Sequence, residues 1–127
     1  MDETPRLTPA AFEARASVVM SLHYGVTFTK GRVGSVHKEF DFVDGSRNVV
    51  GDAKYYTLVR GVQLPPAKFS VIAEHVWLLE HTAATDRFLV FGNDRRVPER
   101  WLHRFGNLAH GVAFYFLAAD STLHRLN

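Results

Sequence analysis

Cysteine is absent from this sequence of 127 residues. The absence excludes disulfide frameworks, thiolate nucleophiles and cysteine-ligated zinc sites. The glycine motifs of nucleotide-binding proteins, GxGxxG and the P-loop, are also missing, as are the GxSxG motif of serine hydrolases and the HExxH motif of zinc hydrolases. Any chemistry must therefore come from carboxylates, histidines, lysines and hydroxyl side chains.

Long apolar runs are missing too, since no stretch approaches the ~18 residues that a membrane span requires. The first six residues are polar and acidic, unlike the start of a signal peptide. We therefore expect an intracellular, cytoplasmic protein with no membrane partner. Hydrophobic residues at 46% and charged residues at 22% are typical of a globular chain, so residues 1–127 are expected to form one domain.

The net charge is only +2, but most of the 15 basic residues are arginine. The planar guanidinium of arginine suits phosphate and carboxylate recognition, which points to an anionic partner. GC-rich coding or thermal adaptation explains the same bias equally well.

The spacing of apolar residues and of Gly and Pro predicts eight elements. They are helices over 9–24, 65–83 and 98–106, and strands over 26–33, 37–44, 48–60, 88–91 and 112–118, followed by a polar tail over 121–127. The order α-β-β-β-α-β-α-β predicts an α/β domain with a single mixed β-sheet and flanking helices on both faces.

The second and third predicted strands form a hairpin with an apolar and a charged face. Alternation places Phe40 and Phe42 on one face and Glu39, Asp41 and Val43 on the other. The second strand of the hairpin alternates in the same way between small or apolar residues and charged ones. The charged faces of the two strands therefore meet in one patch.

The length of the turn decides which charged residues meet. A two- or four-residue turn sets Asp41 directly opposite Asp52, and Glu39 opposite Lys54. A three- or five-residue turn would put the two aspartates on opposite faces of the sheet. Opposed carboxylates destabilise a hairpin by a few tenths of a kcal/mol or more, so a cation is expected between them.

Two chemical readings of this patch stay open. Mg²⁺ takes oxygen ligands from one or two carboxylates and keeps several waters, so the pair Asp41 and Asp52 with Lys54 is typical of phosphodiester hydrolysis. The other reading is a solvated sheet face on which Lys38, Glu39, Asp41 and Lys54 form ordinary ion pairs. The position of Asp52 in the middle of a long strand favours chemistry, because aspartate is a poor strand former.

The sequence resembles the PD-(D/E)xK nuclease superfamily, which has the restriction-endonuclease-like fold. The motif here is Asp41, ten intervening residues, then Asp52-Ala53-Lys54; Phe40 stands where the family motif has proline. The resemblance implies that Asp41 and Asp52 are metal ligands and that Lys54 is the catalytic lysine. It further implies an acid from the first helix, for which Glu13 matches by position; the other reading of Glu13 is a surface acid near a helix N-terminus.

The resemblance covers residues 9–92, with 97–119 as a C-terminal extension. Within the superfamily the chain is similar to small Holliday-junction resolvases and very-short-patch-type nucleases. The implied activity is that of a DNA endonuclease dependent on Mg²⁺ or Mn²⁺. The alternative is a catalytically silent nucleic-acid-binding or assembly subunit on the same fold. A homodimer is expected if both strands of a duplex are cut.

Basic residues outside the hairpin are candidates for contact with nucleic acid. Arg96, Arg100 and Arg104 recur at helical spacing in the third predicted helix, and Lys68 lies at the start of the second. His37 is expected at the rim of the hairpin site. The other reading of the arginine stripe is a solvated amphipathic face.

Overall fold

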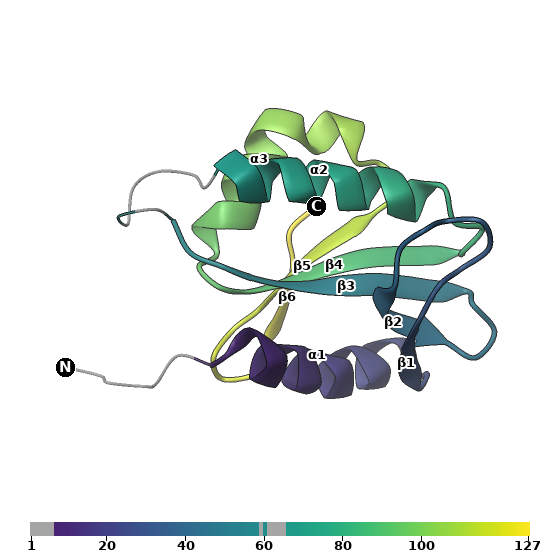
Figure 1. The fold of residues 1–127 in the computed structure, drawn as a ribbon. Coiled ribbons are helices and arrows are strands. Elements are labelled where there is room, and N and C mark those ends of the chain that lie inside the picture. Colours follow the sequence, from purple (N-terminus) through teal and green to yellow (C-terminus); the bar gives the residue numbers. More distant parts are fainter. Residues whose placement is uncertain (1–6, 59, 61–65) are drawn as a thin grey trace.

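The computed structural model describes residues 7–58, 60 and 66–127. This part of the chain forms one mixed six-stranded sheet with three α-helices and a short 3₁₀ turn, which confirms the predicted α/β class (Figure 1). The elements are α1 (Pro9–Tyr24), β1 (Phe28–Gly31), β2 (Phe40–Asp44), β3 (Val49–Tyr56), α2 (Pro66–Glu80), β4 (Asp86–Asn93), α3 (Arg96–Phe105), η1 (Gly106–Leu108), β5 (Ala113–Leu117) and β6 (Leu123–Arg125).

The strands lie in the sheet in the order β1-β2-β3-β4-β5-β6. β3, β4 and β5 are parallel, whereas β1, β2 and β6 are joined to their neighbours by antiparallel pairing. Helix α1 covers one face and α2 and α3 cover the other (Figure 1). The central strand β4 is therefore apolar on both sides: Phe88 packs with Phe12 of α1, and Leu89 packs with Ile72 of α2.

Helix α1 begins and ends at the residues that the sequence indicated. The Thr8 hydroxyl accepts a hydrogen bond from the Ala11 N–H at 3.1 Å, Pro9 is the first helical residue, and Gly25 ends the helix with a φ of 69°. Its buried residues Phe12 and Met20 lie on the sheet side. This docking sets the position of the rest of α1 relative to β3.

The observed strand bounds correct several expectations. β1 and β2 are shorter than predicted, and β3 ends at Tyr56 rather than at residue 60; residue 59 of the predicted strand lies outside the described residues. α3 begins at Arg96 rather than Pro98, because the Asp94 carboxylate accepts the Arg96 N–H at 3.1 Å. The polar tail contains the edge strand β6, which is too short to show alternation in the sequence.

One further prediction was wrong: Phe40 and Phe42 do not share a face. Phe40 packs with Val43 in the cluster beneath α2, and Phe42 packs in the cluster beneath α1. The cause is a register shift in which Thr29 pairs with Val43 but Gly31 pairs with Phe40, so β2 carries one extra residue. A bulge of this kind redirects the side chains around it, and Asp41 lies within it.

A close approach between β3 and β4 gives a test of the packing beneath α1. A Cβ atom added to Gly51 would lie 2.6 Å from the Phe88 ring, which itself stacks on Phe42. We expect Gly51→Ala to lower the free energy of unfolding by about 1–3 kcal/mol through overpacking, as measured by urea denaturation. Gly45→Ala is the matched control, since its Cβ would meet nothing within 4 Å. Equal stability of the two variants would contradict this packing.

Candidate active site

The hairpin of β2 and β3 has the predicted register, with Phe42 opposite Gly51 and Val43 opposite Val50. Beyond these pairs, carboxylates take the place of backbone acceptors. The Asp41 N–H donates to Asp52 Oδ1 at 2.8 Å, and the Ala53 N–H donates to Asp41 Oδ2 at 2.9 Å. Each aspartate is thus held by the neighbouring strand at the point where β2 separates from β3.

A third carboxylate reaches this point from α1. The ammonium group of Lys30 on β1 lies 2.9 Å from the Glu13 carboxylate and 3.5 Å from Asp41 Oδ1. Glu13 and Asp41 are themselves close enough to share a hydrogen bond. Both acids keep contact with solvent, with 29% and 22% of their side chains exposed. Acids from α1, β2 and β3 are therefore linked in a row, Glu13 beside Asp41 and Asp41 beside Asp52.

The hydrogen bond between Glu13 and Asp41, which are both partly exposed, shifts their pKa values in opposite directions. Burial raises the pKa of Glu13, and its hydrogen bond to Asp41 adds to the rise. Burial also raises the pKa of Asp41, but the hydrogen bonds from Glu13 and from the Ala53 N–H outweigh it, so the net shift is downward. Glu13 is therefore the acid of the pair that takes up a proton first.

Asp52 is buried, with 1% of its side chain exposed, and faces nitrogen atoms. Its Oδ2 lies 2.9 Å from Lys38 Nζ, 3.7 Å from Lys54 Nζ and 3.3 Å from His75 Nδ1. No described residue makes a hydrogen bond of good geometry to this oxygen, so the ammonium groups of Lys38 and Lys54 stabilise it by charge. Burial raises the pKa of Asp52, although the charges of Lys54 and Lys38 oppose the shift.

Lys54 projects from β3 to the same side as Asp52 and contacts Nδ1 of His75 on α2. Burial lowers the pKa of Lys54, while the Asp52 charge opposes that shift. Burial, followed by the charges of Lys54 and Lys38, lowers the pKa of His75 to about 3. His75 is therefore neutral near pH 7 and its Nδ1 accepts a hydrogen bond from the ammonium group.

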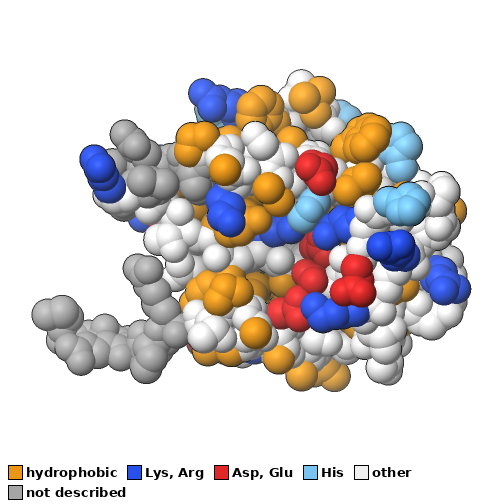
Figure 2. All heavy atoms as spheres, in the orientation of Figure 1, with side chains coloured by type: hydrophobic (Ala, Val, Ile, Leu, Met, Phe, Trp, Pro, Cys, Tyr) orange, Lys and Arg blue, Asp and Glu red, His pale blue; other side chains and the backbone are white. Residues whose placement is uncertain are grey.

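A groove of about 440 Å³ adjoins Lys54 along the free edge of β3. It lies between the beginnings of α1 and α2, and its lining includes Pro9, Tyr56 and Lys68. The Lys68 ammonium lies 5.2 Å from the centre of the Tyr56 ring. Figure 2 shows acidic, basic and histidine side chains gathered between the two helix layers, beside a hollow in this face. Two lysines, Lys54 and Lys68, therefore line the same groove.

The donor atoms of the site bear on whether it can hold a divalent metal. Glu13, Asp41 and Asp52 offer only oxygen atoms, which is the chemistry that Mg²⁺ and Mn²⁺ prefer. Within residues 7–58, 60 and 66–127, however, no three His, Asp or Glu side chains already stand in a metal-binding arrangement. The Lys30 ammonium occupies the space between Glu13 and Asp41, and 53% of its side chain is exposed. The donor chemistry therefore suits a divalent metal, whereas the arrangement of the described side chains does not bring three donors together.

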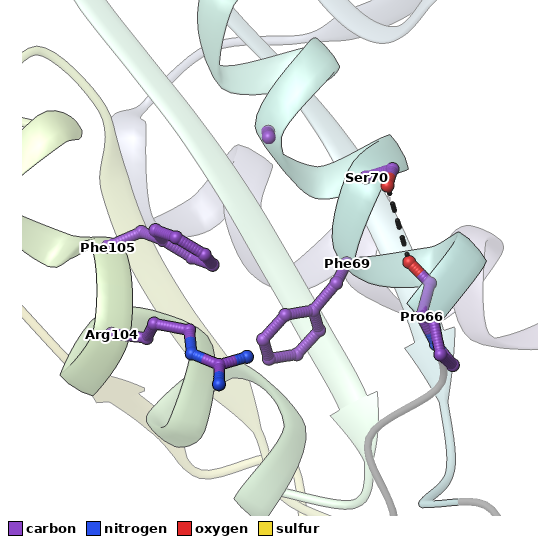
Figure 3. A pocket seen from close by; sticks show the side chains of 6 residues that line it. Pro66, Phe69, Ser70, Arg104 and Phe105 are labelled. Atoms are coloured by element: carbon purple, nitrogen blue, oxygen red, sulfur yellow. Dashed lines mark hydrogen bonds between the residues drawn. The ribbon is translucent and has the colours of Figure 1, made fainter.

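The other predicted contact residues divide between two surfaces. Lys68 lines the groove beside Lys54. Arg96, Arg100 and Arg104 line a hollow of about 410 Å³ on α3. Arg104 also borders a pocket between α2 and α3 with Phe69 and Phe105 (Figure 3). The arginine stripe thus forms a second surface, with lining residues different from those of the groove.

Two predictions about the hairpin need correction. Glu39 does not pair with Lys54: it precedes β2, is exposed, and Lys38 contacts Asp52 instead. His37 is exposed as well, and no described contact connects it to the carboxylates. The physical reason is that β2 begins only at Phe40, so the strand alternation does not extend to these residues.

Sequence reasoning gave no role in the site to Lys30 or His75, and it placed Lys38 only among the ion pairs of a solvated face. Lys30 and Lys38 lie in or beside the bulged part of the β1–β2 pairing, where alternation gives no orientation. His75 lies three residues after Ile72 on α2, and Ile72 is fully buried. That helical spacing was the available signal that His75 faces the sheet.

Comparisons with known proteins add no relationship, because no family model and no curated protein matches the chain. The fold and the site are therefore the observations on which a function must be argued. The described residues also contain no helix that is long and apolar enough to cross a membrane.

The proton shared by Glu13 and Asp41 can be followed by NMR titration of the Glu13 carboxyl carbon. We expect the Glu13 pKa to rise further in Lys30→Met, because the Lys30 ammonium lowers it by hydrogen bonding and by charge. We expect it to fall in Asp41→Asn, because Asp41 raises it in both ways. Arg95→Met, which removes the distant partner of Glu99, is the control. An unchanged Glu13 pKa in both site variants would contradict the coupling.

Proposed function

We propose that this protein is a metal-dependent endonuclease that hydrolyses phosphodiester bonds in DNA, on a fold like that of the PD-(D/E)xK nucleases. One observation carries the proposal: Asp41 and Asp52, with Glu13 beside Asp41, lie next to buried Lys54, and Lys54 lines the groove along β3. Acidic oxygens for a metal, a cation for a phosphate and space for a chain are the requirements of phosphodiester hydrolysis.

Glu13, Asp41 and Asp52 would hold Mg²⁺ or Mn²⁺. Such an ion supplies a nucleophilic water and Lewis-acid stabilisation of the phosphate. Asp41 and Asp52 are fixed in place because each accepts a backbone N–H of the opposite strand. Lys54, which borders the groove, places a positive charge where a phosphoryl oxygen gains negative charge.

The substrate backbone is proposed to follow the groove from Lys54 toward Lys68. The free edge of β3 forms its floor, and Lys68 with Tyr56 forms one side. Lys68 then contacts a phosphate neighbouring the scissile one, where each such contact adds salt-dependent affinity. Arg96, Arg100 and Arg104 are proposed to contact more distant phosphates of a duplex, and a homodimer would cut both strands.

A second candidate function is a catalytically silent nucleic-acid-binding or assembly subunit. The observation that favours it is that Lys30 and Lys38 already neutralise the acids, with Lys38 Nζ only 2.9 Å from Asp52 Oδ2. Such a subunit would use the same groove without hydrolysis. The two functions differ in their response to metal.

Cleavage assays separate these functions. Plasmid, four-way-junction and single-stranded DNA are incubated with Mg²⁺ or Mn²⁺ and the wild type, Asp52→Asn or Lys54→Met. We expect each variant to lose about a hundredfold or more of the cleavage rate, as when one preorganised electrostatic group is removed from an active site. Asp120→Asn, which changes an exposed acid outside the site, should cleave like the wild type. DNA binding without cleavage by the wild type would favour the silent subunit.

Metal binding is measured separately by thermal unfolding in Mn²⁺ and in EDTA. Because a ligand at a hundred times its Kd stabilises a protein by about 2.7 kcal/mol, we expect Mn²⁺ to raise the wild-type Tm by several degrees. Asp41→Asn should lose this rise, since it removes one ligand, whereas Asp120→Asn should keep it. An equal rise in Asp41→Asn would place the metal elsewhere.

A further inference from the structure

We infer that His75 is a positioning residue for Lys54: it receives the lysine ammonium through Nδ1 and so aims it at the groove. The inference rests on the proposed function and adds to it a residue outside the acid-x-lysine motif. His75 comes from α2, on the opposite side of the site from the acid supplied by α1.

The contacts of Nδ1 determine what His75 can do. This nitrogen faces Lys54 Nζ and lies 3.3 Å from Asp52 Oδ2. A neutral imidazole with its proton on Nε2 has an acceptor at Nδ1, and an ammonium group has three N–H donors. Lys54 therefore directs one N–H to His75, while its ammonium group lies 3.7 Å from Asp52 Oδ2 and the residue also lines the groove.

The surroundings of Lys54 explain why a second partner is needed. Asp52 Oδ2 is 3.7 Å from Lys54 Nζ but 2.9 Å from Lys38 Nζ, so Lys38 holds the carboxylate more closely. Asp52 alone leaves the end of the flexible lysine side chain weakly directed. His75 is anchored on a helix whose neighbours Ile72 and Val76 are buried, and only 15% of its side chain is exposed. It thus supplies a rigid second point of attachment.

Three substitutions separate a directed hydrogen bond from simple packing. Asn carries an acceptor oxygen near the position of Nδ1, Gln carries one near that of Nε2, and Leu has none. If His75 positions Lys54 through Nδ1, His75→Asn should keep function, while His75→Gln and His75→Leu should lose it. If His75 only filled space, the activities of the three variants would follow their stabilities instead.

The first measurement is steady-state cleavage together with Tm for all three variants. We expect kcat to fall about ten- to a hundredfold in His75→Leu and His75→Gln, with KM changed less than threefold, since a misplaced catalytic group costs rates of this order. His75→Asn should recover to within about threefold of the wild-type kcat. Loss of kcat in proportion to loss of Tm across the set would overturn the inference.

The second measurement does not depend on catalysis. Without metal, acetylation of Lys54 by an N-hydroxysuccinimide ester is followed by peptide mass spectrometry, with exposed Lys30 as the internal reference. We expect Lys54 to react about fivefold or more faster, relative to Lys30, in His75→Leu and His75→Gln than in the wild type and His75→Asn, because an ammonium group without its hydrogen-bond acceptor loses its proton more readily. Equal relative rates in all four proteins would overturn the inference. If the wild type cleaves no substrate, the proposed function fails, and this measurement still decides whether His75 holds Lys54.

Discussion

The exchange of hydrogen bonds between Asp41 and Asp52 is the interaction on which the site depends. Asp41 uses its N–H to hold Asp52, and its own carboxylate accepts the N–H of Ala53. These two bonds satisfy backbone donors that would otherwise lose their partners where β2 leaves β3. The strands can therefore part without leaving those N–H groups unpaired. One side of β3 becomes the floor of an open groove while its other side stays paired with β4.

Burial of Asp52 requires positive charge close by, because an isolated carboxylate in the interior is strongly destabilising. Lys38 and Lys54 provide that charge, and β4 and α2 keep water away. Burial pushes both Lys54 and Asp52 toward their neutral forms, whereas their mutual attraction favours the ionised forms. Such opposed effects on buried ionisable groups are typical of sites that do chemistry. Ordinary surface ion pairs, the other reading of this sheet face, would leave Asp52 exposed.

The sequence predicts the fold well where a feature repeats over many residues. The capped apolar stripe of α1 and the continuous apolar run of β4 indicate the layers, and the turn of the hairpin indicates that Asp41 faces Asp52. Prediction from the sequence fails where one inserted residue changes the geometry of a strand. The bulge in β2 separates Phe40 from Phe42, and it leaves Glu39 outside the strand. His75 could not be assigned, because its role depends on how α2 packs over β3.

The charge balance of the site bears on how a metal and an anionic substrate would bind there. Glu13, Asp41 and Asp52 face the ammonium groups of Lys30, Lys38 and Lys54, so the site is close to neutral as it stands. A divalent cation among the same oxygens would make the cluster strongly positive unless a lysine left or a phosphate arrived. Lys30 is the lysine free to leave, since it is half exposed, whereas Lys54 is held by burial and by His75. The anionic substrate that we propose for the groove would remove the same excess of charge. Metal and nucleic acid would therefore assist each other's binding at this site, with Lys30 giving way to both.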